Sequence, residues 1–323
     1  MTISDAISTR SPRRFFPAVI LFVFLTSSAG AEAAESEPFL VVLGIAQDAG
    51  FPQAGCNKVC CAKAWQSSHL RRYATSIAVV DPTSKQRWLF ECTPNFPDQL
   101  HLLDRLAPLN TNSSLDGILL THAHVGHYAG LIHLGREVMG TNQLPVYAMP
   151  RMAGFIRNNG PWSQLVTLKQ IELRAMKNRT TFRLNSRIKV TPIIVPHRDE
   201  FSETVGFIIA GPRHRVLFLP DIDKWEKWDI PIERELAKVD IAYLDGTFFG
   251  DGELPGRDMS KIPHPSIQES IRRFKGLSPA DRGKVRFIHL NHTNPALKPD
   301  SPAAKIITKS GHHIAQQGEK QPL

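Results

Sequence analysis

Three histidines follow a short apolar segment of the sequence. Residues 115–120 are largely apolar, apart from Asp116, and are bounded by turn residues, which predicts a short buried strand. His122, His124 and His127 come directly after it, so the first two rings can turn toward one point on the loop that leaves the strand. Neutral imidazole is a favoured ligand for zinc, iron and nickel, and catalytic zinc sites combine several histidines with one open position. The spacing therefore predicts a metal site.

Three more predicted strands lead to histidine or aspartate. His197 follows a strand at 187–195, Asp221 follows one at 216–219, and His292 lies just beyond one at 285–290. Each residue by itself would be an ordinary surface residue after a strand. Four such strands in one chain point to a shared site, because clustered ligand types are the recognised signal of one.

The pattern of apolar segments predicts an α/β chain. Strands are predicted at 39–46, 76–81, 87–91, 117–121, 146–148, 187–195, 204–210, 216–219, 241–244 and 285–290. Helices are predicted at 97–106, 127–139, 151–158, 232–237 and 266–274. The strands pair as hairpins at first and alternate with helices later, which predicts a four-layer αββα sandwich with the ligands on loops at one edge. We assign this domain to residues 38–309 and a polar, frayed tail to 310–323.

The first 31 residues have the composition of a signal peptide. Three arginines between positions 10 and 14 precede an apolar core at 15–25, and a small-residue cleavage site ends at Ala31. The core is shorter than the roughly 20 residues of a membrane span. We expect a periplasmic or secreted protein, with no stable membrane insertion after cleavage.

The charge of the chain does not suggest a nucleic-acid partner. The formal net charge is +9, but lysine and arginine are scattered, and no basic patch with interleaved aromatic residues suggests nucleic acid. We expect a small-molecule substrate, and the positive balance suits an anionic one.

The histidine motif resembles that of the metallo-β-lactamase superfamily, Thr-His-x-His-x-Asp-His. This chain reads Thr-His-Ala-His-Val-Gly-His at 121–127, so Gly126 stands where the superfamily has an aspartate. Residues 43–52, 244–248 and 288–295 resemble one branch, the pyrroloquinoline quinone biosynthesis protein B family. These stretches span most of the chain beyond its first residues, and the resemblance implies the αββα sandwich.

The resemblance also implies a ligand set. It assigns six residues to the metals: His122, His124 and His197 to the first ion, Asp221 to both, and His127 and His292 to the second. Gly126 removes a carboxylate from the second site, so that ion would bind more weakly or be absent. Zinc suits these ligands, as one or two ions, and iron is the alternative.

The chemistry expected of such a site follows from the metal. Zinc with an open position lowers the pKa of bound water to about 7. Asp221 would orient the resulting hydroxide, and His264 resembles a substrate-side histidine of related phosphodiesterases that could act as general acid. Asp245 would hydrogen-bond a ligating histidine, and we expect His289 to support a ligand and not to bind metal itself.

Three cysteines form a second group of metal-ligand type. Relatives in this branch carry a Cys-x-Cys-x-x-Cys cluster that holds a structural zinc. Here Cys56 and Cys61 match the outer positions, Lys58 replaces the middle one, and Cys60 is the available substitute. An oxidising compartment would favour a disulfide from Cys56 to Cys60 or Cys61. Spacing leaves the zinc site and the disulfide equally open.

The sequence thus predicts an exported metal-dependent hydrolase that uses metal-bound hydroxide on an ester, phosphodiester or amide-like bond. One alternative is an iron-dependent oxidative enzyme related to quinone-cofactor biosynthesis. Another is a non-catalytic module that binds a metal or another ligand. The intact His-x-His and Asp221 favour an enzyme, whereas Gly126 favours the binding module.

Overall fold

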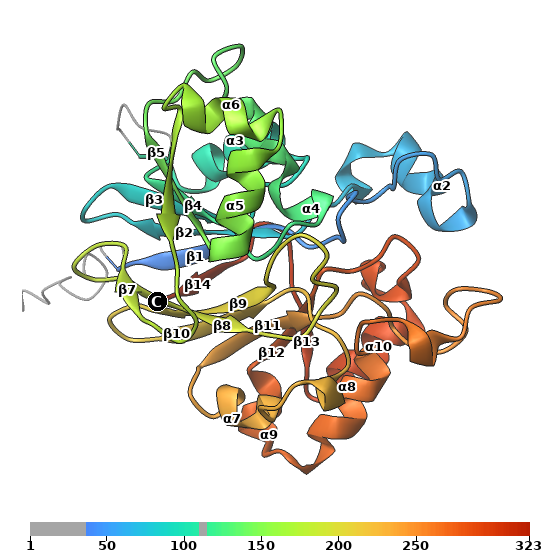
Figure 1. The fold of residues 1–323 in the computed structure, drawn as a ribbon. Helices are drawn as coiled ribbons and strands as arrows, with labels where there is room; N and C mark the ends of the chain where they lie inside the picture. Colours follow the sequence, from blue (N-terminus) through green and yellow to red (C-terminus); the bar gives the residue numbers. More distant parts are fainter. Residues whose placement is uncertain (1–36, 110–114) are drawn as a thin grey trace, which may run out of the picture.

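Two seven-stranded sheets form the centre of the molecule. The computed structural model describes residues 37–109 and 115–323 (Figure 1). The first sheet contains β1 (Phe39–Gly44), β2 (Ser76–Asp81), β3 (Gln86–Phe90), β4 (Gly117–Leu119), β5 (Leu144–Ala148), β6 (Ile171–Ala175) and β14 (Lys320–Pro322). The second contains β7 (Phe182–Arg183), β8 (Lys189–Ile194), β9 (Val205–Ala210), β10 (Arg215–Leu219), β11 (Ile241–Asp245), β12 (Val285–Ile288) and β13 (His313–Ile314). Their orders are β14-β1-β2-β3-β4-β5-β6 and β13-β12-β11-β10-β9-β8-β7.

Helices cover the outer face of each sheet (Figure 1). On the first sheet lie α3 (Phe96–Leu106), α5 (Pro150–Asn158) and α6 (Trp162–Thr167). On the second lie α7 (Ile232–Leu236), α8 (Ile267–Arg273), α9 (Pro279–Gly283) and α10 (Pro302–Lys309). Two short helices, α2 (Val59–Gln66) and α4 (Val125–Tyr128), lie outside these layers. The order helix, sheet, sheet, helix confirms the predicted αββα sandwich.

Alternating apolar residues explain why both faces of the first sheet are buried. In β2, Ile77 and Val79 belong to the core between the sheets, whereas Ala78 and Val80 belong to the core beneath the helices. Successive side chains of a strand point to opposite faces, so one continuous apolar run supplies both cores. Phe90 joins the sheets, since its ring lies edge-on to Phe207 with centroids 5.4 Å apart.

The direction of the strands determines where their ends meet. β3 and β4 are parallel, and so are β10, β11 and β12. β1 is antiparallel to β2, which is antiparallel to β3, and β8 is related to β10 through β9 in the same way. Within each sheet these strands therefore end at one common edge, where ligands of open α/β sheets usually bind.

The predicted helix at 127–139 is wrong. The structure has only the short α4 there, followed by a 3₁₀ segment at Ala129–Leu134. Two backbone groups that an α-helix would use internally bond to Cys92 instead: the His127 carbonyl accepts from the Cys92 N–H, and the Gly130 N–H donates to the Cys92 carbonyl. The apolar spacing had a helical period, but contacts with residue 92 replaced the helix.

The predicted frayed tail at 310–323 is also wrong. The tail adds β13 to the second sheet and β14 to the first, where β14 pairs with β1. Its last residue, Leu323, is fully buried, and Glu319 accepts a hydrogen bond of 2.7 Å from the Tyr243 hydroxyl. The polar composition of the tail hid this role, because an edge strand can be held by its main chain alone.

The signal peptide predicted at 1–31 lies outside the described residues and stays a prediction. Within 37–109 and 115–323, no helix is both long enough and apolar enough to cross a bilayer.

Because Leu323 is fully buried beside Gly211, we expect Leu323→Ala to lower the free energy of unfolding by about 2–5 kcal/mol, the usual cost of truncating a buried leucine. Denaturant unfolding followed by circular dichroism measures it. Pro322→Ala is the control, because Pro322 is the exposed last residue of β14, next to Leu323, and should change stability by about 0.5 kcal/mol or less. Equal effects of the two substitutions would contradict the packed tail.

Candidate metal centre

The candidate ligands gather where strands of both sheets end. His122 and His124 follow β4, and His127 lies in α4 immediately after them. His197 follows β8 and Asp221 follows β10. The common direction of these strands thus brings together residues that lie up to a hundred positions apart.

The first cluster contains His122, His124, His197 and Asp221. Each offers one ligand atom, and these atoms all lie within 4.8 Å of one another. The Asp221 Oδ2 atom is 3.3 Å from His122 Nε2, and its Oδ1 atom is 3.4 Å from His197 Nε2. His124 lies nearest to solvent, and its Nε2 atom is 3.1 Å from Glu200 Oε2. Three imidazoles and a carboxylate are a donor set that suits zinc.

The second cluster contains Asp48, His127 and His289, again with ligand atoms within 4.8 Å of one another. Asp48 Oδ1 is 3.1 Å from His127 Nε2 and 3.7 Å from His289 Nε2. Asp221 reaches this cluster too, because its Oδ2 atom is 3.6 Å from His127 Nε2 and 3.9 Å from His289 Nε2. Asp221 therefore lies between the two clusters, as a bridging carboxylate would.

Neighbouring side chains fix the orientation of the rings. His122 Nδ1 is 2.8 Å from the Thr121 hydroxyl, and His289 Nδ1 is 2.9 Å from the Thr247 hydroxyl. His127 Nδ1 is 3.5 Å from Glu91, which is fully buried. In all three residues the Nε2 atom is left to point into the cluster, which is the arrangement of metal-binding histidines.

Buried polar atoms without partners test whether a metal fits. Among the described residues, five such atoms lie at the centre of these clusters with no hydrogen bond, although they are only a few ångströms apart: Asp48 Oδ1, His127 Nε2, His197 Nε2, Asp221 Oδ1 and His289 Nε2. Buried polar atoms are normally hydrogen-bonded, and buried charges are paired or bind metals. Within each cluster the ligand atoms lie within 4.8 Å of one another, so the residues of each cluster fit a cation.

Burial and neighbouring charges set the protonation of the first cluster. Burial lowers the pKa of His197 to about 4, and burial together with the His127 charge holds the pKa of His122 well below its usual range. Burial works against ionisation of Asp221, but the facing histidines hold its pKa well below its usual range. His122 and His197 are thus neutral and Asp221 is ionised at neutral pH, which are the protonation states that bind a metal.

Another histidine, His264, also contacts Asp221. His264 Nδ1 is 3.2 Å from Asp221 Oδ1 and 2.8 Å from Asp245 Oδ2. Burial alone would lower the pKa of His264, but the two carboxylates raise it to about 10. Asp245, predicted to orient a ligating histidine, bonds to His264 and to Thr247, which in turn contacts His289.

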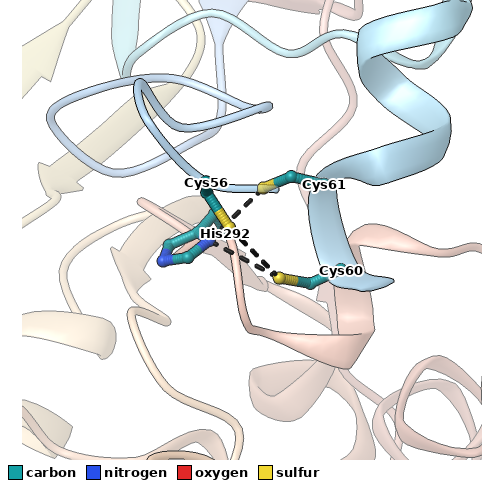
Figure 2. A group of neighbouring side chains, drawn as sticks. All are labelled: Cys56, Cys60, Cys61 and His292. Carbon is teal, nitrogen blue, oxygen red and sulfur yellow. Dashed lines mark hydrogen bonds between the residues drawn. The ribbon is translucent and has the colours of Figure 1, made fainter. Parts of the chain in front are cut away.

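The cysteines form a separate cluster with His292 (Figure 2). Cys56 Sγ is 3.7 Å from Cys60 Sγ, and His292 Nδ1 is 3.3 Å from Cys61 Sγ and 3.7 Å from Cys60 Sγ. All three cysteines are free, and a disulfide would bring two sulfurs to about 2.05 Å. A tetrahedral zinc with bonds of about 2.3 Å separates its sulfurs by about 3.8 Å, close to the spacing observed.

A family model agrees with the fold and the motif. Residues 86–290 match the model described as a β-lactamase superfamily domain. The chain belongs to the metallo-β-lactamase superfamily.

Relatives within this superfamily include the coenzyme PQQ synthesis protein B of Xanthomonas oryzae pv. oryzae, which is 26% identical over 306 residues and covers 86% of this chain and 98% of its own length. Among solved structures, zinc-bound PqqB from Methylobacterium extorquens has a TM-score of 0.75 at 23% identity and covers 88% of this chain and 100% of its own. A diphosphatase of the PhnP family has a TM-score of 0.62 at 21% identity and covers 89% and 97%. The similarity to the PQQ synthesis branch predicted from the sequence is confirmed.

The structure corrects the assignment of His292 to the second metal ion. His292 lies with the cysteines, whereas His289 takes the position beside His127. β12 ends at Ile288, and His289 has a left-handed backbone with φ of 65° that turns its side chain away from the alternation of the strand. The prediction assumed that the strand continued to 290. His289 directly follows Ile288, the last residue of the strand.

Asp48 is the residue that sequence reasoning missed. It follows β1, which ends at the same edge as β4, and it lies against Gly126. A Cβ atom added to Gly126 would lie 2.6 Å from the Asp48 Cβ atom and closer still to its Cα and Oδ1. The gap in the superfamily motif is therefore filled by the Asp48 side chain. A carboxylate directly after a buried strand was a signal available in the sequence.

Because the space beside Gly126 is taken, we expect Gly126→Ala to lower the free energy of unfolding by about 1–3 kcal/mol, the cost of overpacking. Chelator-treated protein in a urea titration measures this without any contribution from metal. Gly154→Ala in α5 is the matched control, since the added Cβ atom meets nothing within 4 Å. This substitution should raise the free energy of unfolding by about 0.4–1 kcal/mol. If Gly126→Ala is as stable as Gly154→Ala, Asp48 does not occupy this space.

Proposed function

We propose that this chain is a metal-dependent hydrolase acting on an ester, phosphodiester or amide-like bond. The observation that carries the proposal is the first cluster, in which the ligand atoms of His122, His124, His197 and Asp221 lie within 4.8 Å of one another, just beyond the ends of three strands. Burial favours the neutral form of His122 and His197 that a metal needs, and the facing histidines favour the ionised form of Asp221.

A divalent metal such as zinc, when bound there, acts as a Lewis acid that makes a water acidic enough to attack near neutral pH. His122, His124 and His197 would hold the ion, and Asp221 would orient the attacking water. Asp221 suits the second task because its Oδ1 atom faces His197, whereas its Oδ2 atom lies near both His122 and His127, so one oxygen can bind a metal while the other accepts a proton.

His264 is placed to protonate the leaving group. Its Nδ1 atom is held by Asp245, and its Nε2 atom makes no hydrogen bond to any described residue. With its pKa raised to about 10, the ring carries a proton at neutral pH. Positioned acids of this kind contribute about 10²–10⁴-fold to a rate. The raised pKa means that this proton is present at neutral pH and lost only as the pH rises toward 10.

The relatives named for coenzyme PQQ synthesis favour a second candidate, an oxidative enzyme with iron at the same ligands. Similarity to the Xanthomonas protein extends over 86% of this chain, so it is not confined to the metal motif. Imidazole and carboxylate bind iron as well as zinc. The nature of the bound metal therefore separates the two candidates.

The cysteine cluster would have a structural and not a catalytic function. We infer that Cys56, Cys60, Cys61 and His292 hold a structural metal ion, because four ligands leave no open position for a substrate. Burial raises the pKa of Cys61 to about 12, so its thiolate needs a cation beside it. Such an ion would tie the loop before α2 to the segment after β12 (Figure 2).

If Asp221 orients the attacking water, Asp221→Asn should lower turnover of an ester or phosphodiester probe by at least about 100-fold, the lower range for a positioned acid–base group. Metal content must be measured in the same samples, because loss of the ion would give the same result. Asp229→Asn, an exposed aspartate outside these clusters, should keep full activity.

Near-normal turnover of metal-loaded Asp221→Asn would remove Asp221 from the mechanism. If the fully metal-loaded wild type hydrolyses no probe and contains a redox-active metal, the oxidative enzyme becomes the better candidate. If it hydrolyses none and contains zinc, the chain is a binding module.

If the cysteine cluster binds a metal, Co²⁺-loaded protein should show the charge-transfer absorption of thiolate–cobalt bonds. His292→Ala should lower the affinity for Co²⁺ by at least about tenfold, because it removes one of four ligands. The affinity is measured by titration of this absorption. His289→Ala is the matched control, since His289 lies in the other cluster and should leave the absorption unchanged. A protein mass two hydrogens short of the free thiols would show the alternative disulfide.

A further inference from the structure

We propose that Asp48 is the carboxylate ligand of a second metal ion, in place of the side chain that Gly126 lacks. This ion would bind to Asp48, His127, His289 and the second oxygen of Asp221. The inference rests on the proposed metal-dependent function, because it places the second ion beside the first. It goes further by assigning the role of a motif residue to a position 78 residues earlier in the chain.

The path of the chain after β1 brings Asp48 to the site. Ala46 pairs with Leu290, the Leu290 N–H donates to the Ile45 carbonyl, and the Gln47 N–H donates to the Leu290 carbonyl, both at 2.8 Å. Asp48 and His289 therefore lie next to residues of two segments that are hydrogen-bonded to each other. A turn closed by a bond from the Gly50 N–H to the Gln47 carbonyl holds Asp48 at its tip.

The Asp48 side chain behaves as a ligand and not as a surface carboxylate. Its Oδ1 atom is buried without a hydrogen bond to any described residue, 3.1 Å from His127 Nε2 and 3.7 Å from His289 Nε2. Both of these nitrogens are themselves buried without a hydrogen-bond partner. Three polar atoms that face one point, none of them satisfied, need a cation between them.

Space allows only one carboxylate at this point. A side chain on Gly126 would begin where the Cα, Cβ and Oδ1 atoms of Asp48 lie. A chain with an aspartate at position 126 would therefore need a different residue or path at position 48. Asp48 thus replaces the aspartate that the motif has at position 126. The second site keeps a carboxylate, and Gly126 does not imply that this site is weakened.

The charge of the second cluster agrees with a bound cation. Asp48 brings one negative charge to it, and Asp221, which also faces the first cluster, brings a second. Fully buried Glu91 adds another carboxylate behind His127 Nδ1, where it would favour a strongly basic imidazole ligand.

The test is the number and affinity of zinc ions bound to the full chain, measured by elemental analysis and by titration of chelator-treated protein. Asp48→Asn has nearly the same shape but a poorer ligand. We expect it to bind one zinc fewer than wild type, or to bind one zinc at least about tenfold more weakly. Asp48→Ser gives the same readout should the first variant fail to fold. Asp98→Asn, an exposed aspartate of α3, is the control and should bind as wild type does.

His124→Ala separates this inference from the proposed function. It removes a ligand of the first ion alone, and with Asp48 intact the second ion should stay. If both Asp48 variants fold and bind zinc as wild type does while His124→Ala loses an ion, Asp48 is not a ligand and the metal-dependent function stands. If wild type binds no zinc beyond that of the cysteine cluster, the proposed function fails and this inference fails with it.

Discussion

The structure depends on a group of imidazoles and carboxylates that are buried together without satisfying one another. Asp221 is fully enclosed by histidines, yet its Oδ1 atom accepts no hydrogen bond from any described residue. Taking an ion out of water costs several kcal/mol, and the cost is offset only by partners of good geometry. The paired sheets hold these groups in place by their apolar cores, and a cation would supply the missing partner. A bound cation would therefore offset the free-energy cost of burying these groups.

The Asp48–Gly126 pair places a carboxylate beside the motif position that has no side chain in this chain. What a metal site needs is a carboxylate oxygen at a certain point, and either of two segments can deliver it. β1 and β4 end at the same edge, so the loops that follow them compete for the same space. A glycine in one loop makes room for an aspartate in the other.

The second cluster and the cysteine cluster lie on the same two backbone segments. The segment that carries Asp48 continues into the loop of Cys56, and the segment that carries His289 continues to His292. Hydrogen bonds between residues 45–47 and Leu290 join the two segments at their start, and the contacts of His292 with Cys60 and Cys61 join them at their end. The cysteine cluster therefore lies where it can stabilise the loop on which Asp48 depends.

The sequence by itself determined the αββα sandwich, most strands and the residues of the first cluster, His122, His124, His197 and Asp221. Buried strands and a histidine motif are local patterns, so they can be recognised without the fold. It did not determine that His289 and not His292 faces His127, since one left-handed residue at the end of β12 decides that. It also could not place Asp48 against Gly126 or the tail in both sheets, because these contacts join residues that lie far apart in the chain. Only the tertiary structure decides which ligand-type residues share a point in space, because that depends on where each strand stops and on which backbone groups distant segments bond.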